Sequence, residues 1–178
     1  KSGSLKRERL VEAVTRILTM KFRTADRVQP AVATVGSPEH ERLVAALDAA
    51  SITVLRGRCT APVSGAVTVT ASPDREVARV TLVKALQAAG VQVRAAGGSV
   101  IHLVGYGDRA GDLDQAAAVT VMMDTPYLLS ASRSPSLIAT YSSSRLSLTA
   151  LADVLAGKKP AKGRSPVPVS GLPRSACA

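Results

Sequence analysis

The chain has 178 residues, 46% of them apolar, which is enough for one hydrophobic core. No apolar run approaches the roughly 18 residues that a membrane-spanning helix needs, so we expect no membrane span. The net charge of +10 would suit nucleic acid, but the chain has no Trp, one Phe and three Tyr, which excludes a stacking platform for single strands. We therefore interpret the charge as a solvated basic surface and expect no nucleic-acid partner.

The first predicted element is a helix over residues 4–23, with charged side chains around an apolar face. Such a helix could bind a membrane surface, but a docking helix with an exposed charged face is the favoured interpretation. Residues 24–35 are predicted to be a linker, so we divide the chain into 1–35 and a domain over 36–178. The residues of the apolar face are Leu10, Val14, Ile17 and Leu18.

A second helix is predicted to begin at Ser37-Pro38-Glu39, which supplies a hydroxyl cap, a first-turn proline and an acid. His40 lies in its first turn and is predicted to face solvent. The helix is expected to bury an apolar stripe of Leu43, Val44, Leu47 and Ala50.

Short β-branched or apolar runs bounded by Gly, Pro and Ser predict a series of strands. A helix begins near Ser72 and ends near Gly90, with a predicted buried side of Val77, Val80, Leu82, Val83 and Leu86. Strands that alternate with helices and are apolar on both faces favour a parallel sheet covered on two sides. The expected fold is therefore a three-layer α/β/α sandwich with a mostly parallel sheet, preceded by an N-terminal helix. The predicted strands are 52–55, 67–70, 91–94, 100–104 and 118–123.

Several residues between these strands could carry chemistry. The glycines at 97–98 and 105–107 lack the spacing of phosphate-binding loops, so turns that need positive φ explain them better. His102 lies within an apolar strand and is interpreted as a hydrogen-bonded core histidine. Asp108, Asp112 and Asp114 lack the closing Glu of a calcium loop and are interpreted as a mobile surface loop. We expect no metal and no cofactor.

Met123-Asp124-Thr125-Pro126-Tyr127 follows the predicted central strand, where ligands usually approach an open parallel sheet. The last predicted helix has Leu148, Leu151 and Leu155 on one face. Gly157 is placed as its C-terminal cap, and the prolines beyond it exclude further helix.

Five stretches between about Arg9 and Arg174 resemble the family-three glycoside hydrolases, including the following three. Residues 150–157, ALADVLAG, are similar to the family's "ALADVLFG" helix before its C-terminal "NPSGRLPVTIP", although Ala156, Lys159 and Ser165 depart from that pattern. Residues 9–23 resemble "RLDEAVRRILRLKFR", the last helix of the family's catalytic barrel. Residues 121–128 are similar to "VVALRNPYDL" of the β-N-acetylglucosaminidase branch. The resemblance implies that Asp124, Pro126 and Tyr127 border the substrate cleft, in a loop that faces the barrel.

The resemblance further implies an accessory C-terminal domain of an exported enzyme that releases terminal β-N-acetylglucosamine from cell-wall or chitin-derived oligosaccharides by a retaining mechanism. We expect the chain to keep only the tail of the barrel, and its partners to be that barrel and the oligosaccharide substrate. The family's nucleophilic Asp lies on a barrel strand, and no Glu follows Glu76. Because most glycosidases need two carboxyl groups, we expect no catalytic residue here and an inactive chain.

Export would also make a disulfide between Cys59 and Cys177 favourable, whereas in a reducing compartment both would be thiols. The N-terminal helix is expected to be exposed or buried in a homodimer, because its apolar residues would pack on barrel elements. The alternative hypothesis is a free-standing α/β module that binds an anionic ligand or cell-wall glycan.

Overall fold

The computed structural model describes residues 5–177, and the chain divides between Ser37 and Pro38 into two compact units. The first unit contains helix α1 (Arg7–Ala25) and a 3-10 turn, η1 (Val32–Thr34). Helix α1 has no buried residue, and Glu12 pairs on its surface with Arg16 at 3.4 Å. No helix within the described residues is both long and apolar enough to cross a membrane.

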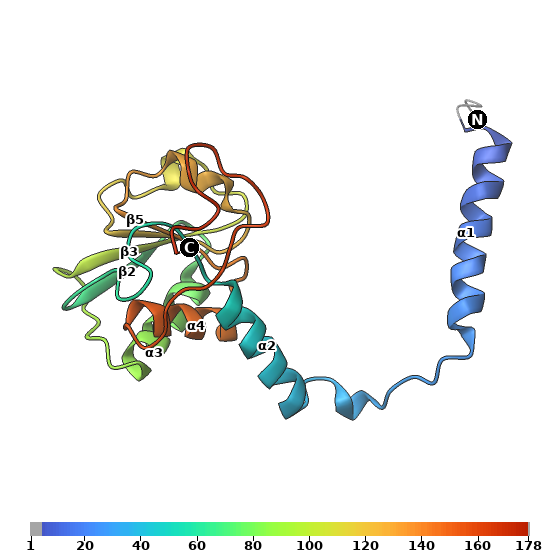
Figure 1. Ribbon diagram of the computed structural model, residues 1–178, viewed down its shortest axis with the longest axis horizontal. Coiled ribbons are helices and arrows are strands. Elements are labelled where there is room, and N and C mark those ends of the chain that lie inside the picture. Colours follow the sequence, from blue (N-terminus) through green and yellow to red (C-terminus); the bar gives the residue numbers. More distant parts are fainter. Residues whose placement is uncertain (1–4, 178) are drawn as a thin grey trace. The chain divides into compact units, whose positions relative to one another are not determined.

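The second unit is built on a five-stranded sheet in the order β1-β5-β4-β3-β2. Strands β2 to β5 are parallel to one another, and β1 pairs antiparallel with β5 at one edge. Figure 1 shows α3 and α4 below this sheet and the short helices above it. The elements in chain order are α2 (Pro38–Ser51), β1 (Thr53–Arg56), β2 (Val67–Ala71), α3 (Glu76–Ala88), β3 (Ser99–Val104), η2 (Ala110–Asp112), β4 (Val119–Met122), η3 (Pro126–Ala131), β5 (Ser136–Ala139) and α4 (Arg145–Leu155).

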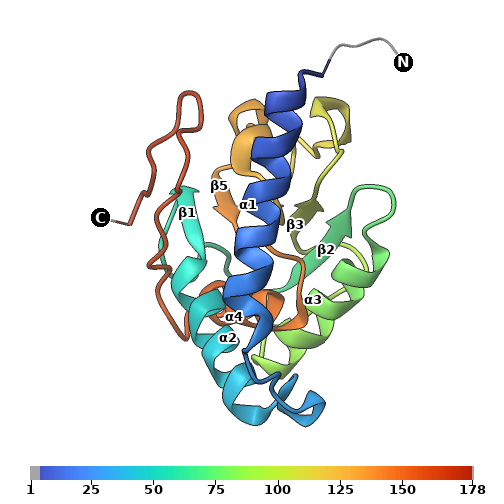
Figure 2. The same ribbon diagram turned by 90° about the vertical axis from the view of Figure 1, so that its right-hand side faces the viewer.

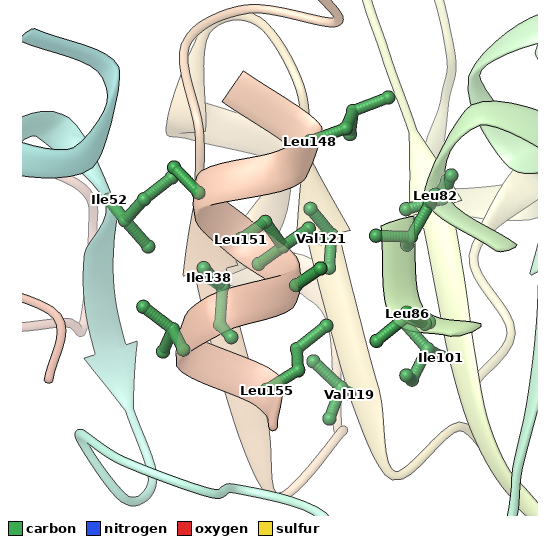
Figure 3. Packing of buried hydrophobic residues seen from close by; sticks show 14 of the residues in the cluster. Ile52, Leu82, Leu86, Ile101, Val119, Val121, Ile138, Leu148, Leu151 and Leu155 are labelled. Carbon is green, nitrogen blue, oxygen red and sulfur yellow. The ribbon is translucent and has the colours of Figure 1, made fainter. Parts of the chain in front are cut away.

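The main core lies between one face of the sheet and helices α3 and α4. Leu151 and Leu155 of α4 point at Ile138 and Val119 of the sheet, as Figure 3 shows. The other face of the sheet is covered by η3 and the C-terminal tail. Leu129 of η3 and Val169 of the tail belong to a second apolar cluster there. The predicted α/β fold, with a mostly parallel sheet and helices on both sides, is confirmed.

Three local predictions were wrong in detail. Residues 91–94 do not form a strand. Val93 makes only an isolated bridge to Val67, and Arg94 N donates to the Val67 carbonyl. Helix α3 buries Ala78, Leu82 and Leu86 but leaves Val77 82% exposed. Apolar residues occur around most of this helix, so their spacing did not fix which side faces the sheet.

Helix α2 also turns the other way from the prediction. Leu43 and Leu47 are 62% and 68% exposed, whereas Asp48 is buried and accepts a hydrogen bond from Ser144 Oγ at 3.3 Å. Ala49 of α2 is instead partly buried against the main core, to which α4 contributes Val154. The apolar stripe is therefore real, but this unit does not cover it.

Helix α4 is capped at both ends. Ser144 accepts a hydrogen bond from Ser147 N at 3.1 Å, so the helix begins before Leu148. At the other end Gly157 has a φ of 75°, and its N–H and that of Lys158 satisfy the carbonyls of Val154 and Asp153. This geometry confirms Gly157 as the predicted cap.

The C-terminal tail returns along the β1 edge of the sheet, as Figure 2 shows. Gly163 N donates to Ile52 O at 2.8 Å, and Ala176 N donates to Val54 O at 2.7 Å. Any side chain at Gly163 would collide with the backbone beside Ile52, so only glycine permits this approach. Cys177 forms a disulfide with Cys59, which fixes the end of the tail.

Candidate functional site

The carboxyl ends of the four parallel strands all lie at one edge of the sheet. Ser72 and Arg75 follow β2, Asp108 follows β3, Asp124 follows β4 and Tyr141 follows β5. The end of a parallel sheet is where ligands usually bind, because the loops there converge on one crevice. This edge is therefore the first place to look for a site.

Asp108 holds the loops after β2 and β3 together. Its carboxylate accepts hydrogen bonds from Ser72 Oγ at 2.5 Å and from Gly105 N at 2.6 Å, and it lies 3.4 Å from Arg75 Nη2. Burial acts to raise the pKa of Asp108, but the bonds from Ser72, Gly105 and Arg75 outweigh it and hold the pKa below its usual value. Arg75 also donates to the carbonyl of Tyr106.

These contacts correct the interpretation of residues 108–114 as merely a surface loop. The Asp108 side chain is only 10% exposed, and Asp112 accepts a hydrogen bond from Arg109 N at 2.7 Å. The glycine prediction was partly right, since Gly107 has a φ of 91°. Gly105 has a different role, because a Cβ there would lie 2.7 Å from Arg75 Nε and would force that side chain to shift.

A cavity of about 400 Å³ opens beside this network. Its lining includes the three residues predicted to border the substrate cleft, Asp124, Pro126 and Tyr127. The border role itself stays a prediction. Asp124 Oδ2 accepts a hydrogen bond from Tyr106 N at 2.7 Å, which ties the loop after β4 to the loop after β3. The lining consists of Tyr106, Asp124, Thr125, Pro126, Tyr127, Tyr141, Pro166 and Val167.

All three tyrosines of the chain line this one cavity. Tyr106 and Tyr127 are 77% and 54% exposed, so their rings are available to a ligand. Tyr141 has a φ of 58°, a conformation that bulky residues rarely adopt. Its hydroxyl oxygen is buried and has no hydrogen-bond partner among the described residues.

The cavity suits binding rather than acid–base catalysis. Asp124 is the one carboxylate in its lining, and Asp108 is already occupied by its hydrogen bonds. Hydrolysis of a glycosidic bond usually needs two carboxyl groups on opposite sides of that bond. A single carboxylate among aromatic rings can orient and bind a ligand.

His102 and the remaining acids form no further site. His102 is 6% exposed, and its Nε2 lies 2.8 Å from the carbonyl oxygen of Asp112, to which it donates. Its Nδ1 lies 2.9 Å from Thr70 Oγ1, so the ring is a hydrogen-bonded core histidine, as predicted. Across residues 5–177, no group of three or more His, Cys, Asp and Glu side chains could hold a metal ion.

The sequence analysis missed Tyr106, Tyr141 and Arg75 as residues of this edge. The signal for Tyr106 was available in the sequence, since Tyr106 follows the predicted strand 100–104 in the way that Tyr127 follows the predicted strand 118–123. Arg75 gave no signal, because its position in a helix-start motif carries no information on its partners across the sheet.

Several solved structures share this architecture. A family 3 β-N-acetylglucosaminidase from Paenibacillus sp. str. FPU-7 matches 94% of this chain and 41% of its own, with a TM-score of 0.67 and 23% identity. A fungal multi-domain family 3 β-N-acetylglucosaminidase matches 96% of this chain and 24% of its own, with a TM-score of 0.66 and 15% identity.

The β-glucoside phosphorylase BglX, bound to 2FGlc, matches 93% of this chain and 39% of its own, with a TM-score of 0.65 and 20% identity. The chain therefore spans less than half the length of these proteins, and the matches extend from Pro38–Ala178 into the preceding residues. They confirm the resemblance to family 3 glycoside hydrolases at the level of the fold. No family model and no curated protein matches the sequence.

Proposed function

We propose that this chain is the C-terminal α/β domain of an exported family-three glycoside hydrolase, together with the last helix of its catalytic barrel. The parent enzyme would release terminal β-N-acetylglucosamine from cell-wall or chitin-derived oligosaccharides by a retaining mechanism. The chain by itself would not hydrolyse sugar. Its role would be to pack on the barrel and to border the substrate cleft with Asp124, Pro126 and Tyr127.

The observation that carries this proposal is the apolar face that α1 leaves uncovered within its own unit. Leu10, Ile17 and Phe22 are 52%, 51% and 75% exposed, and no residue of α1 is buried. Complete burial of such a side chain contributes at most about 1.5–3 kcal/mol, so a partner surface for this helix is favoured. The residues of this helix are the ones that resemble the final helix of the family's barrel, which supports the barrel as the proposed partner.

The cavity supports the cleft-border role. It lies at the edge of the sheet where ligands approach, and Tyr127 presents an exposed ring beside Asp124. Aromatic rings and a few polar groups are the usual lining of small-molecule sites. The alternative of a free-standing module that binds an anion is less well supported, because the charged residue in this lining is an acid.

The disulfide supports export. Disulfides persist in oxidising compartments and are rare in proteins of the cytosol, and the structure joins Cys59 to Cys177. Two free thiols in protein isolated from its native compartment would contradict this part of the proposal. Mass spectrometry without reductant makes that measurement.

The expected inactivity is tested with a chromogenic β-N-acetylglucosaminide and the purified chain. We expect no turnover above the rate of the Asp124→Asn variant, which lacks the one carboxylate of the cavity. Turnover by the wild-type chain that this substitution abolishes would show that the domain carries its own chemistry and would overturn the accessory role.

The gene distinguishes the accessory domain from the free-standing module. Under the proposal, the reading frame upstream of the Lys1 codon encodes a catalytic barrel with an acid on one of its strands. A start codon immediately upstream would contradict the proposal and favour the module. In that case the face of α1 would need another partner, and a second copy of the chain is the candidate.

A further inference from the structure

The cavity beside Asp124 has an electrostatic character opposite to that of the chain. The chain carries a net charge of +10, yet the one charged residue in the cavity lining is an acid. Asp124 accepts one hydrogen bond, from Tyr106 N, and makes no ion pair within residues 5–177. Its negative charge is therefore not neutralised by a bonded cation of the chain.

The nearby arginine offsets one of the two carboxylates beside it but not both. Arg75 Nε and Asp124 Oδ2 both lie within 3.0 Å of the point where a Cβ of Gly105 would sit, so the two groups are neighbours. Arg75, however, is paired with Asp108 at 3.4 Å and donates to the Tyr106 carbonyl. Together Arg75, Asp108 and Asp124 carry one excess negative charge, and that charge faces the cavity.

The rest of the lining suits a cation. Tyr106 and Tyr127 offer exposed aromatic rings, and ring faces attract ammonium groups within about 6 Å. An ammonium group has three donors and no acceptor, so the Asp124 carboxylate complements it.

We propose that this cavity binds the protonated amine of an amino sugar, a glucosamine unit of a partly deacetylated glycan, in preference to a neutral sugar. The sugar class rests on the proposed function above, whereas the preference for an amine rests on the charge and lining of the cavity. Tyr127 packs against the sugar ring, and Asp124 binds the ammonium group at C2.

The test compares three methyl β-glycosides that share one ring and differ at C2: the glucosaminide, the N-acetylglucosaminide and the glucoside. Each is titrated into the full chain while the backbone amides are followed by NMR. The amide of Tyr106 is the reporter, because it donates to Asp124. We expect the glucosaminide to shift this amide at concentrations at least about tenfold below the two neutral sugars, as expected for a hydrogen bond to a charged group.

Asp124→Asn keeps an acceptor for Tyr106 N but removes the charge, so it should weaken glucosaminide binding about tenfold or more and leave the neutral sugars unchanged. Glu39→Gln removes the same charge from the exposed start of α2 and is the matched control, with no expected effect. Asp124→Glu restores the charge and should recover part of the preference, which separates loss of charge from damage to the fold.

The outcomes separate this inference from the proposed function. Equal binding of all three glycosides at the Tyr106 reporter overturns the preference for an amine and leaves the cleft-border role standing. No binding of any glycoside overturns the inference and also removes this cavity from the cleft, while the role of α1 in docking stays open to its own test. A glucosaminide preference that Glu39→Gln abolishes as strongly as Asp124→Asn also overturns the inference, because it reports the overall charge.

Discussion

Helices α1 and α4 have the same kind of sequence pattern and opposite environments. Both repeat apolar residues at helical spacing with polar residues between them. Helix α4 buries seven residues, including Leu148, Leu151 and Leu155, whereas α1 buries none. An amphipathic pattern therefore shows that a helix has a face to cover, and only the tertiary structure shows whether its own unit covers that face.

Hydrogen exchange should give the largest difference between the two helices. Amides in the middle of α4 should exchange only when the whole α/β unit unfolds, and those of α1 by local opening, so we expect protection at least about a thousandfold greater in α4. Equal protection would mean that α1 is covered in solution. Protection of α1 that rises with protein concentration would identify a second copy of the chain as its cover.

Reduction of the disulfide should weaken the α/β unit and leave α1 unchanged. Cys59 and Cys177 are 118 residues apart, and closing so long a loop contributes about 4–5 kcal/mol in the chain-entropy model. Denaturant unfolding with and without reductant measures the difference. The chain has two cysteines, so the reductant has no other target, and an unchanged midpoint would contradict the stapling role.

Matched leucine substitutions test the comparison at single residues. Leu151→Ala in α4 removes a fully buried side chain and should lower the free energy of unfolding by about 2–5 kcal/mol. Leu10→Ala in α1 removes one that is 52% exposed and should change it by less than about 0.5 kcal/mol. A comparable loss from both substitutions would show that α1 is part of a buried interface.

Paired glycine substitutions test whether the site edge is as tightly packed as the core below it. Gly105→Ala would place a Cβ 2.7 Å from Arg75 Nε and should lower the free energy of unfolding by about 1–3 kcal/mol. Gly111→Ala has open space around the new Cβ and serves as the control. If thermal unfolding shows the two variants to be equally stable, the loops at this edge are looser than the structure indicates.

The smallest expected effect is a pH dependence that belongs to the α/β unit alone. The hydrogen bonds from Ser72 and Gly105 and the charge of Arg75 hold the folded pKa of Asp108 below that of an unfolded aspartate. Asp108 therefore stabilises the fold above the unfolded pKa and loses this contribution as the pH falls through the folded pKa. Asp108→Asn should therefore flatten the acid side of the stability curve. Unfolding free energies of both proteins at a series of acid pH values measure this, and parallel curves would contradict it.

The sequence predicted the α/β class, the order of most elements and the cap at Gly157 because these depend on local signals. Periodicity, capping residues and β-branched runs act within a few residues of one another. Asp124, Pro126 and Tyr127 could be singled out because the end of a central parallel strand is readable along the chain. The sequence did not set the phase of α3, because apolar residues surround most of that helix.

Only the tertiary structure brought Tyr106 and Tyr141 to Asp124 and paired Arg75 with Asp108, since these residues are far apart along the chain and meet only when parallel strands align their ends. It also left the apolar stripe of α2 exposed and placed Asp48 and Ala49 of that helix on the inner side. Sequence patterns fix which faces are apolar. Packing decides which of those faces meet, because each contact depends on the shape of both partners.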